Sequence, residues 1–391
     1  MRGMIRSPNR PGDPAGRWPL LRWYVSSATF GVPQAAGPVA FALVALSMTG
    51  DTRGGAAMML AMTLAQVAGA VPIVRLGAHL PPTAFLRLLI AIRTLALASI
   101  VPMIAYEASF AWLVVSAAVA GSVNGAAFGY LRAVLSRLAP ASRLPRALGI
   151  AATLNELTFV LAPVAASGLG TVSPVFAVLA LVAIGALPAL LVPDTGAAQV
   201  DMARRAGGTA LDRSILLWLM CAASSGAAVA AIEVGAVALA LRFGHEPALA
   251  ILFTVPLCVA SVAGGIWTSV RNRMAGRRTV LAQLGVATSG AALGALDLSA
   301  AATVAGAVLI GSVLAPLGTH YSLVLDKLAP PHRRPEVFAL LRTANATGVI
   351  IASATLTVVS ASTALIVVTG MLTMATAAVA IATVRGGGGT D

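Results

Sequence analysis

The chain contains one stretch of sequence twice, and the two copies are separated by about half of its length. Residues 117–155 align without a gap on residues 307–345, with 13 identities in 39 positions at an offset of 190. The identities include the Gly-Ser-Val triplets that begin at Gly121 and Gly311. A fixed internal period of this kind determines the architecture of a chain. The sequence therefore predicts a protein built from two copies of one unit.

Each copy consists mainly of long apolar runs. Of the 391 residues, 58% are hydrophobic and only 10% are charged, whereas about a quarter are charged in a soluble domain. Apolar runs of roughly 20 residues without alternation are typical of membrane-spanning helices. Twelve spans are predicted, at residues 23–46, 55–75, 84–105, 110–133, 146–168, 174–192, 214–241, 247–270, 279–296, 300–325, 336–358 and 362–384. The predicted fold class is an all-α membrane protein with twelve transmembrane helices in two six-helix bundles.

The basic residues are distributed unevenly between the two ends of the predicted spans. Twenty-two of the 26 Lys and Arg residues lie in the two tails or in connections on the same side, and only Arg53 and Arg242 lie on the other. Lys and Arg favour the cytoplasmic side of membrane proteins. We therefore expect a multi-pass protein of the inner (plasma) membrane with both termini in the cytoplasm. Because the charges are scattered between apolar runs, they form no nucleic-acid-binding patch.

The longest polar stretch between spans is interpreted as a cytoplasmic linker. Six spans precede it and six follow, so the two units repeat in parallel about an axis along the membrane normal. The predicted parts are a cytoplasmic tail (1–22), a first bundle (23–192), the linker (193–213), a second bundle (214–384) and a second cytoplasmic tail (385–391).

Short motifs at the ends of the predicted spans resemble those of the major facilitator superfamily. The connection after the second span contains Gly69 followed by Arg75-Leu76-Gly77, which is similar to the family's Gly-x-x-x-Asp-Arg/Lys-x-Gly-Arg/Lys loop but lacks the acidic residue. The resemblance covers essentially the whole chain. It implies a transporter with two six-helix bundles, which moves its solute by alternating access.

Two further positions extend this resemblance. The second half repeats the loop spacing at Gly265 and Arg271, again without the acidic residue. Residues 162–168 read Ala-Pro-Val-Ala-Ala-Ser-Gly, where antiporters of the family carry Gly-Pro and paired glycines. The arginine motif of proton antiporters is not visible in the fourth span.

The sequence lacks the residues that several kinds of chemistry require. The only lysine, Lys327, does not follow a Gly-rich loop, so no ATP-binding motif is present. His79, His245 and His332 are predicted to lie in loops, and none of the four histidines is spaced as a metal-binding pair. Both cysteines lie within apolar runs, which argues against a disulfide framework. We therefore predict no enzyme, no cofactor and no metal site.

Three charged residues within predicted spans stand out, because charges there are costly and are often functional. Arg93 and Glu156 would each lie about 14 Å from the cytoplasmic face, so they could form a structural ion pair. Alternatively, Glu156 could gain and lose a proton during transport. Glu233 has no cation at its own depth and is the first candidate for proton coupling. Alternatively, it only faces a water-filled outer vestibule. Arg342, near a helix start, could extend to the interface and is assigned no role.

The resemblance also implies which residues face the central space. In the family, the first, fourth, seventh and tenth helices line it. The polar candidates for solute binding on these helices are Gln34, Ser122, Asn124, Tyr130, Ser224, Ser225, Glu233, Ser312, His320 and Tyr321. Asn155 and Asn345, from the repeated Thr-x-Asn element, are added to them. Because this lining carries few charges, it favours a neutral or largely apolar solute.

The leading interpretation is therefore a secondary transporter that exports a small organic solute in exchange for protons. The expected partners are the solute, protons and the lipid bilayer; nucleic acid is not among them, and the expected state is a monomer. Uptake or facilitated diffusion of a neutral metabolite is the alternative within transport. A sensor or assembly partner that resembles a transporter but moves no solute is the alternative outside it, because the loop motif is eroded.

Overall fold

The computed structural model describes residues 17–51, 53–194, 212–358 and 361–386. All regular structure within these residues is helical. The α-helices are α1 (Arg17–Thr49), α2 (Arg53–Leu76), α3 (Pro82–Ala98), α4 (Ile100–Ala105), α5 (Phe110–Leu138), α6 (Leu144–Gly170), α7 (Pro174–Leu191), α8 (Arg213–Glu233), α9 (Ala236–Arg242), α10 (Ile251–Arg271), α11 (Arg277–Ala295), α12 (Ala300–Leu328), α13 (Arg334–Val358) and α14 (Ala361–Gly386). Short 3-10 helices are η1 (Gly77–His79), η3 (Pro247–Ala250) and η4 (Pro331–Arg333).

Eleven helical segments in the described residues are long and apolar enough to cross a membrane. The remaining predicted span corresponds to α11, whose mean hydropathy is lowered by Arg277, Arg278 and Gln283. Because α11 packs against α12 and α14, it completes the second bundle. The predicted fold class, with twelve helices in two bundles, is confirmed.

Two predicted spans are each interrupted by a short break in the helix. The span at 84–105 divides into α3 and α4 at Ser99, because Pro102 has no N–H to donate to the preceding turn. The span at 214–241 divides into α8 and α9 at Val234 and Gly235. Glu233 is therefore the last residue of α8, directly before a break in the helix.

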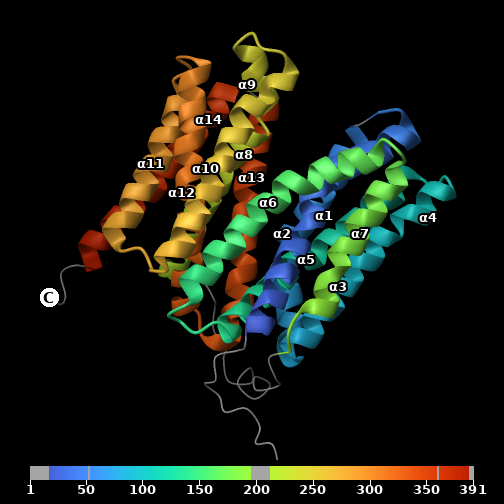
Figure 1. Cartoon of the computed structure of the whole chain (residues 1–391), viewed down its shortest axis with the longest axis horizontal. Coiled ribbons are helices and arrows are strands. Elements are labelled where there is room, and N and C mark those ends of the chain that lie inside the picture. The colour runs from blue at the N-terminus through green and yellow to red at the C-terminus, as the bar shows by residue number, and fades with distance from the viewer. Residues whose placement is uncertain (1–16, 52, 195–211, 359–360, 387–391) are drawn as a thin grey trace, which may run out of the picture.

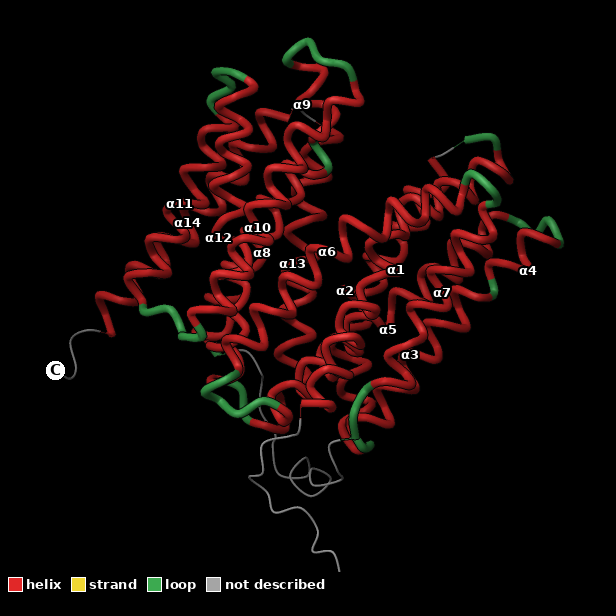
Figure 2. The backbone as a smooth tube through the Cα atoms, in the orientation of Figure 1, coloured by secondary structure: helices red, strands yellow, loops and turns green. Residues whose placement is uncertain are grey.

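Figure 1 shows α1–α7 gathered into one bundle and α8–α14 into the other, and Figure 2 shows that the two bundles adjoin at one end and diverge toward the other. The adjoining end, here called the closed end, carries the connections 77–81, 139–143, 272–276 and 329–333. The diverging end, called the open end, carries the connections 106–109, 171–173, 243–246 and 296–299. Most of the predicted linker and tails lies outside the described residues.

The repeated Gly-Ser-Val triplet has the same structural role in both bundles. A Cβ added to Gly121 on α5 would lie 2.0 Å from the carbonyl oxygen of Met62 on α2. The equivalent Gly311 on α12 meets the carbonyl oxygen of Leu257 on α10 at 2.3 Å. Only glycine allows two helix backbones to approach this closely. The repeat therefore preserves one helix crossing in each bundle.

Two contacts at the closed end join residues that are equivalent in the two copies. Arg132 donates a hydrogen bond of 3.0 Å to the hydroxyl of Ser322, and Ser136 donates one of 2.5 Å to Asp326. Both pairs are 190 residues apart, which is the offset of the repeat. Equivalent positions can touch only beside the axis that relates the copies. That axis therefore runs between α5 and α12.

The apolar core of the first bundle extends across the closed end. Leu323 of α12 and Ala339 of α13 are buried within a cluster that includes Tyr130 and Val134 of α5. Burial of apolar area contributes roughly 25 cal/mol per Å². The two bundles are therefore held together at the closed end by apolar packing as well as by polar contacts.

Candidate functional site

A chain of polar side chains crosses the interior of the first bundle. The Nη1 atom of Arg93 on α3 donates a hydrogen bond of 3.0 Å to the Oδ1 atom of Asn124 on α5. The amide nitrogen of Asn124 lies 2.8 Å from the Oε1 atom of Gln34 on α1 and 2.6 Å from the Oε1 atom of Gln66 on α2. Side chains from four helices thus form one network, which includes two predicted solute-binding candidates, Gln34 and Asn124.

The structure does not form the expected ion pair between Arg93 and Glu156. Arg93 is only 1% exposed, and it donates to the carbonyl oxygens of Phe30 at 3.1 Å and Gly185 at 2.7 Å. Its guanidinium also lies 4.4 Å from the centre of the Phe30 ring. Neutral acceptors from α1, α5 and α7 therefore surround Arg93, whereas Glu156 is on α6, which packs against α10 of the second bundle.

Arg342 of the second bundle joins this network from across the interface. Its Nη2 atom donates a hydrogen bond of 2.8 Å to the Oε1 atom of Gln34. Its guanidinium lies 5.4 Å from the centre of the Phe128 ring on α5. The sequence-based expectation that Arg342 extends to the membrane interface is wrong, because the side chain points between the bundles. The network therefore contains two cations, one from each bundle.

A second group of residues faces this interface from α6, α8 and α10. Glu156 lies on α6 of the first bundle and Glu233 is the last residue of α8 in the second, and both helices contact α10. Ser261 and Cys258 lie on α10, and the hydroxyl of Ser261 is buried without a hydrogen-bond partner in the described residues. Glu233 is exposed and Glu156 is half-buried.

Six of the other predicted residues interact within their own bundle. The hydroxyls of Ser122 and Ser312 donate to carbonyl oxygens in their own helices. Tyr130 and Ser224 are buried and donate to carbonyl oxygens of neighbouring helices. The hydroxyls of Ser225 and Tyr321 lie 3.1 Å apart in the core of the second bundle.

Asn155 and Asn345, the two predicted residues of the repeated Thr-x-Asn element, differ in their surroundings. Asn155 is exposed, and its Oδ1 atom lies near Gly31 of α1. Asn345 is half-buried, and its backbone lies close to Gly226 of α8. These two amides therefore remain solute-binding candidates by position.

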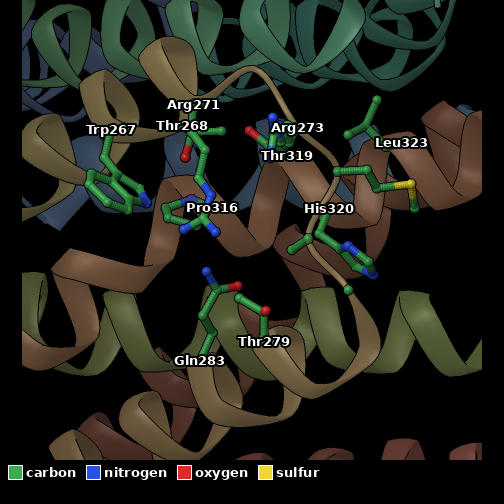
Figure 3. A pocket seen from close by; sticks show the side chains of 13 residues that line it. Trp267, Thr268, Arg271, Arg273, Thr279, Gln283, Pro316, Thr319, His320 and Leu323 are labelled. Atoms are coloured by element: carbon green, nitrogen blue, oxygen red, sulfur yellow. The ribbon is translucent and has the colours of Figure 1, made fainter. Parts of the chain in front are cut away.

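His320 lines a separate pocket within the second bundle. This cavity of about 120 Å³ lies between α10, α11 and α12, and Figure 3 shows Arg271, Arg273 and Gln283 around it with His320. The imidazole is 5% exposed and packs edge-to-face on Trp218 at a centroid distance of 5.0 Å. His320 is therefore positioned by the interior of its own bundle and not by the network around Gln34.

The closed end is held by contacts between the bundles. Arg75 at the end of α2 forms an ion pair of 2.8 Å with Glu336 at the start of α13. Asn272, after α10, accepts a hydrogen bond from the backbone N–H of Arg146 and donates one to the carbonyl oxygen of Ser142, each at 3.0 Å. These contacts would have to separate before this end could open.

Sequence reasoning missed two residues of the site, Gln66 and Arg342. Both lie within predicted spans, so their polarity was a usable signal. Gln66 is uncharged and is on α2, which the family resemblance does not assign to the cavity. The prediction for Arg342 used only its position along the helix. The direction of its side chain around the helix axis determines that it contacts Gln34.

The fold and the site together define a class of protein. Two bundles of membrane-spanning helices enclose polar and charged side chains, and the bundles adjoin at one end and diverge toward the other; this is the architecture of a secondary transporter. The sequence matches the profile of the Major Facilitator Superfamily over residues 25–353. The chain belongs to this family, and it is a transporter and not an enzyme.

Solved structures with the same fold include proteins with different solutes. The human organic anion transporter MFSD10 (TETRAN) is 14% identical with a TM-score of 0.72, covering 95% of this chain and 100% of that one. A bacterial homologue of the iron transporter ferroportin, in an outward-facing state, is 14% identical with a TM-score of 0.74, covering 93% and 98%. The E. coli fucose:proton symporter is 14% identical with a TM-score of 0.68, covering 93% and 99%. No curated protein matches the sequence.

Proposed function

We propose that this transporter exports a small organic solute from the cell in exchange for protons, by alternating access at the inner membrane. In this proposal the closed end faces the cytoplasm, and the structure corresponds to an outward-facing state. The charge distribution supports this orientation, because the arginine-rich connections lie at the closed end. The open end carries Arg53 and Arg242, which pair with the nearby carboxylates of Asp51 and Asp297.

The positions of Glu156 and Glu233 are the observation that carries the proposal of proton coupling. The two carboxylates lie on different bundles, on α6 and α8, and both of these helices contact α10. Among the described residues, neither lies within salt-bridge distance of a basic side chain. When the bundles rock, the separation of the two carboxylates changes, so their proton occupancy would depend on the conformation. A dependence of this kind couples proton binding to the conformational equilibrium.

The contacts at the closed end favour a transporter over a sensor that moves no solute. The loop motif lacks its acidic residue, but Arg75 still forms an ion pair across the bundles with Glu336. Polar contacts of this kind can form and break in each transport cycle. Proton-coupled uptake is the second candidate, because one protein of the same fold is named a fucose:proton symporter.

The substitution Glu233→Gln tests the proposed coupling. The solute would be chosen by a thermal-shift screen of the purified protein, and its transport would be measured in proteoliposomes. Gln resembles the protonated acid, so solute counterflow should continue, whereas accumulation driven by a pH gradient should fall to background. The sign of the gradient that drives transport distinguishes export from uptake.

Glu246→Gln is the matched control, because Glu246 is a carboxylate in the connection 243–246 at the open end. This variant should keep gradient-driven transport. If proteoliposomes with the Glu233→Gln variant still accumulate solute under a pH gradient at the wild-type rate, the same assay on Glu156→Gln decides whether the other carboxylate carries the proton. Full coupling in both variants would refute proton coupling through this pair.

A further inference from the structure

Arg342 is a cation whose hydrogen-bonding groups are only partly used. Of its five N–H donors, the Nη2 atom makes a hydrogen bond of 2.8 Å to the Oε1 atom of Gln34. Its Nε atom is buried and has no hydrogen-bond partner in the described residues. Nε and Nη2 form the edge of a guanidinium that a carboxylate can bind with both of its oxygens. One of the two donors on this edge, Nε, is therefore unpaired, and the other, Nη2, is bound to a neutral acceptor.

The acceptor that Arg342 uses is already shared. The Oε1 atom of Gln34 also accepts a hydrogen bond of 2.8 Å from the amide of Asn124. Through Asn124 the same chain continues to the guanidinium of Arg93. Two cations are thus connected through two neutral amides, and neither cation has a carboxylate within 4.0 Å in the described part of the chain. The network contains positive charge without a compensating anion.

Three other arginines at the interface between the bundles interact with acidic side chains. Arg75 pairs with Glu336, and Arg334 pairs with Asp326 at 3.3 Å. Arg132 interacts with the same aspartate. The carboxylates at the closed end are thus engaged by other arginines. An uncompensated charge within membrane-spanning helices is costly, so the site around Arg342 favours a bound anion.

We infer that Arg342 binds a carboxylate group of the transported solute, between α1, α5 and α13, and that the solute is therefore an organic anion. The carboxylate would occupy the Nε–Nη2 edge and replace the oxygen of Gln34. Phe128, against which the guanidinium packs, would lie beside the bound group. This inference rests on the proposed transport function, and it replaces the expectation of a neutral solute, which was based on a lining with few charges.

Binding would also change the link between the bundles. The bond from Arg342 to Gln34 joins α13 to α1. A carboxylate that takes the Nε–Nη2 edge releases Gln34 and so removes one direct contact across the interface. Solute binding would therefore weaken one of the contacts that hold the bundles in the present arrangement.

The test uses a library of small organic acids, each paired with its uncharged amide, such as benzoate with benzamide. Binding to the purified full-length protein is measured by the shift in melting temperature and by titration. We expect carboxylates, and not their amides, to stabilise the wild type. In Arg342→Gln the affinity should fall by about 10- to 100-fold, as expected for the loss of a hydrogen bond between charged groups. Arg278→Gln, which changes an exposed arginine of α11, is the control and should bind like the wild type.

Gln34→Glu is a second variant, and it does not remove the cation. It supplies Arg342 with an internal carboxylate at the position of the present acceptor. This variant should melt at a higher temperature without ligand and should no longer be stabilised by the acids. Stabilisation of Arg342→Gln or of Gln34→Glu by the acids at wild-type affinity would overturn the inference. So would a library in which no acid stabilises the wild type more than its amide.

Transport measurements separate this inference from the proposed coupling. If proteoliposomes move the amides under a pH gradient and Arg342→Gln does not affect that transport, the carboxylate inference fails while proton coupling stands. If the acids bind in an Arg342-dependent manner but a pH gradient never drives their movement, proton coupling fails while the carboxylate site stands.

Discussion

The two crossings that join the bundles at the closed end are related by the internal repeat, but they are built differently. Where α2 and α5 meet α13, the ion pair of Arg75 with Glu336 accompanies a close approach of Gly129 to the carbonyl oxygen of Pro335. Where α10 meets α6, the side chain of Asn272 binds the backbone of residues 142–146. The first crossing uses a pair of charges, and the second uses a side chain bound to the main chain.

Both crossings depend on glycine. A Cβ at Gly129 would lie 2.2 Å from the Pro335 oxygen, and a Cβ at Gly149 would lie 2.6 Å from the Oγ atom of Ser269. The ion pair is a weaker constraint, because the side chain of Arg75 is 65% exposed and exposed pairs typically contribute about 0–1 kcal/mol. Close backbone packing therefore holds the bundles together at the closed end, whereas the polar contacts mainly fix how the two bundles are oriented there.

The largest effect is expected from Gly129→Ala, because its new Cβ would meet backbone and not a flexible side chain. Overpacking costs about 1–3 kcal/mol, and here that cost falls only on the state in which α5 touches α13. The population with a parted closed end should therefore rise. Spin labels at Glu107 and Glu246, in open-end connections of the two bundles, would report a shorter distance.

Gly168→Ala is the matched control for this measurement, because a Cβ at Gly168 would meet no atom within 4 Å. The distance distribution of this variant should equal that of the wild type. An unchanged distribution in Gly129→Ala would mean that glycine packing does not hold the closed end.

An intermediate effect is expected from Asn272→Gly, which removes the side chain from the second crossing. Asn272 has φ 44°, a left-handed conformation that glycine adopts without strain. The variant therefore loses two hydrogen bonds without a backbone penalty. We expect the same population shift at about 1 kcal/mol, measured with the same labels. Asn272→Ala should shift the population further, since it adds backbone strain; equal shifts in the two variants would show that strain is absent.

The smallest effect is expected from Arg75→Gln. Loss of an exposed ion pair should change the equilibrium between the two states by less than about 1 kcal/mol. At 1 M salt, where the Debye length is about 3 Å, the variant and the wild type should become similar. The label distances at low and high salt measure this. A shift larger than that of Gly129→Ala would reverse the comparison and make the ion pair the main constraint.

The candidate site was only partly predictable from the sequence. Gln34, Asn124, Arg93, Glu156 and Glu233 were all identified as polar or charged residues in predicted spans, and the structure joins Gln34, Asn124 and Arg93 in one hydrogen-bonded network. Their partners were not predictable. The expected pair of Arg93 with Glu156 rested on equal depth in the membrane. Depth follows from the rise of 1.5 Å per residue along a helix, but it does not give the direction in which a side chain points.

The helices and the repeat could be predicted from the sequence alone, because apolar length and internal identity can be read directly along the chain. Equivalent positions such as Ser136 and Asp326 had to be related by one axis, and they meet beside it. The direction in which each side chain points around its helix could not be predicted, because it depends on how neighbouring helices pack. For this reason Arg93 faces carbonyl oxygens and amides, while Arg342 reaches across the interface to Gln34.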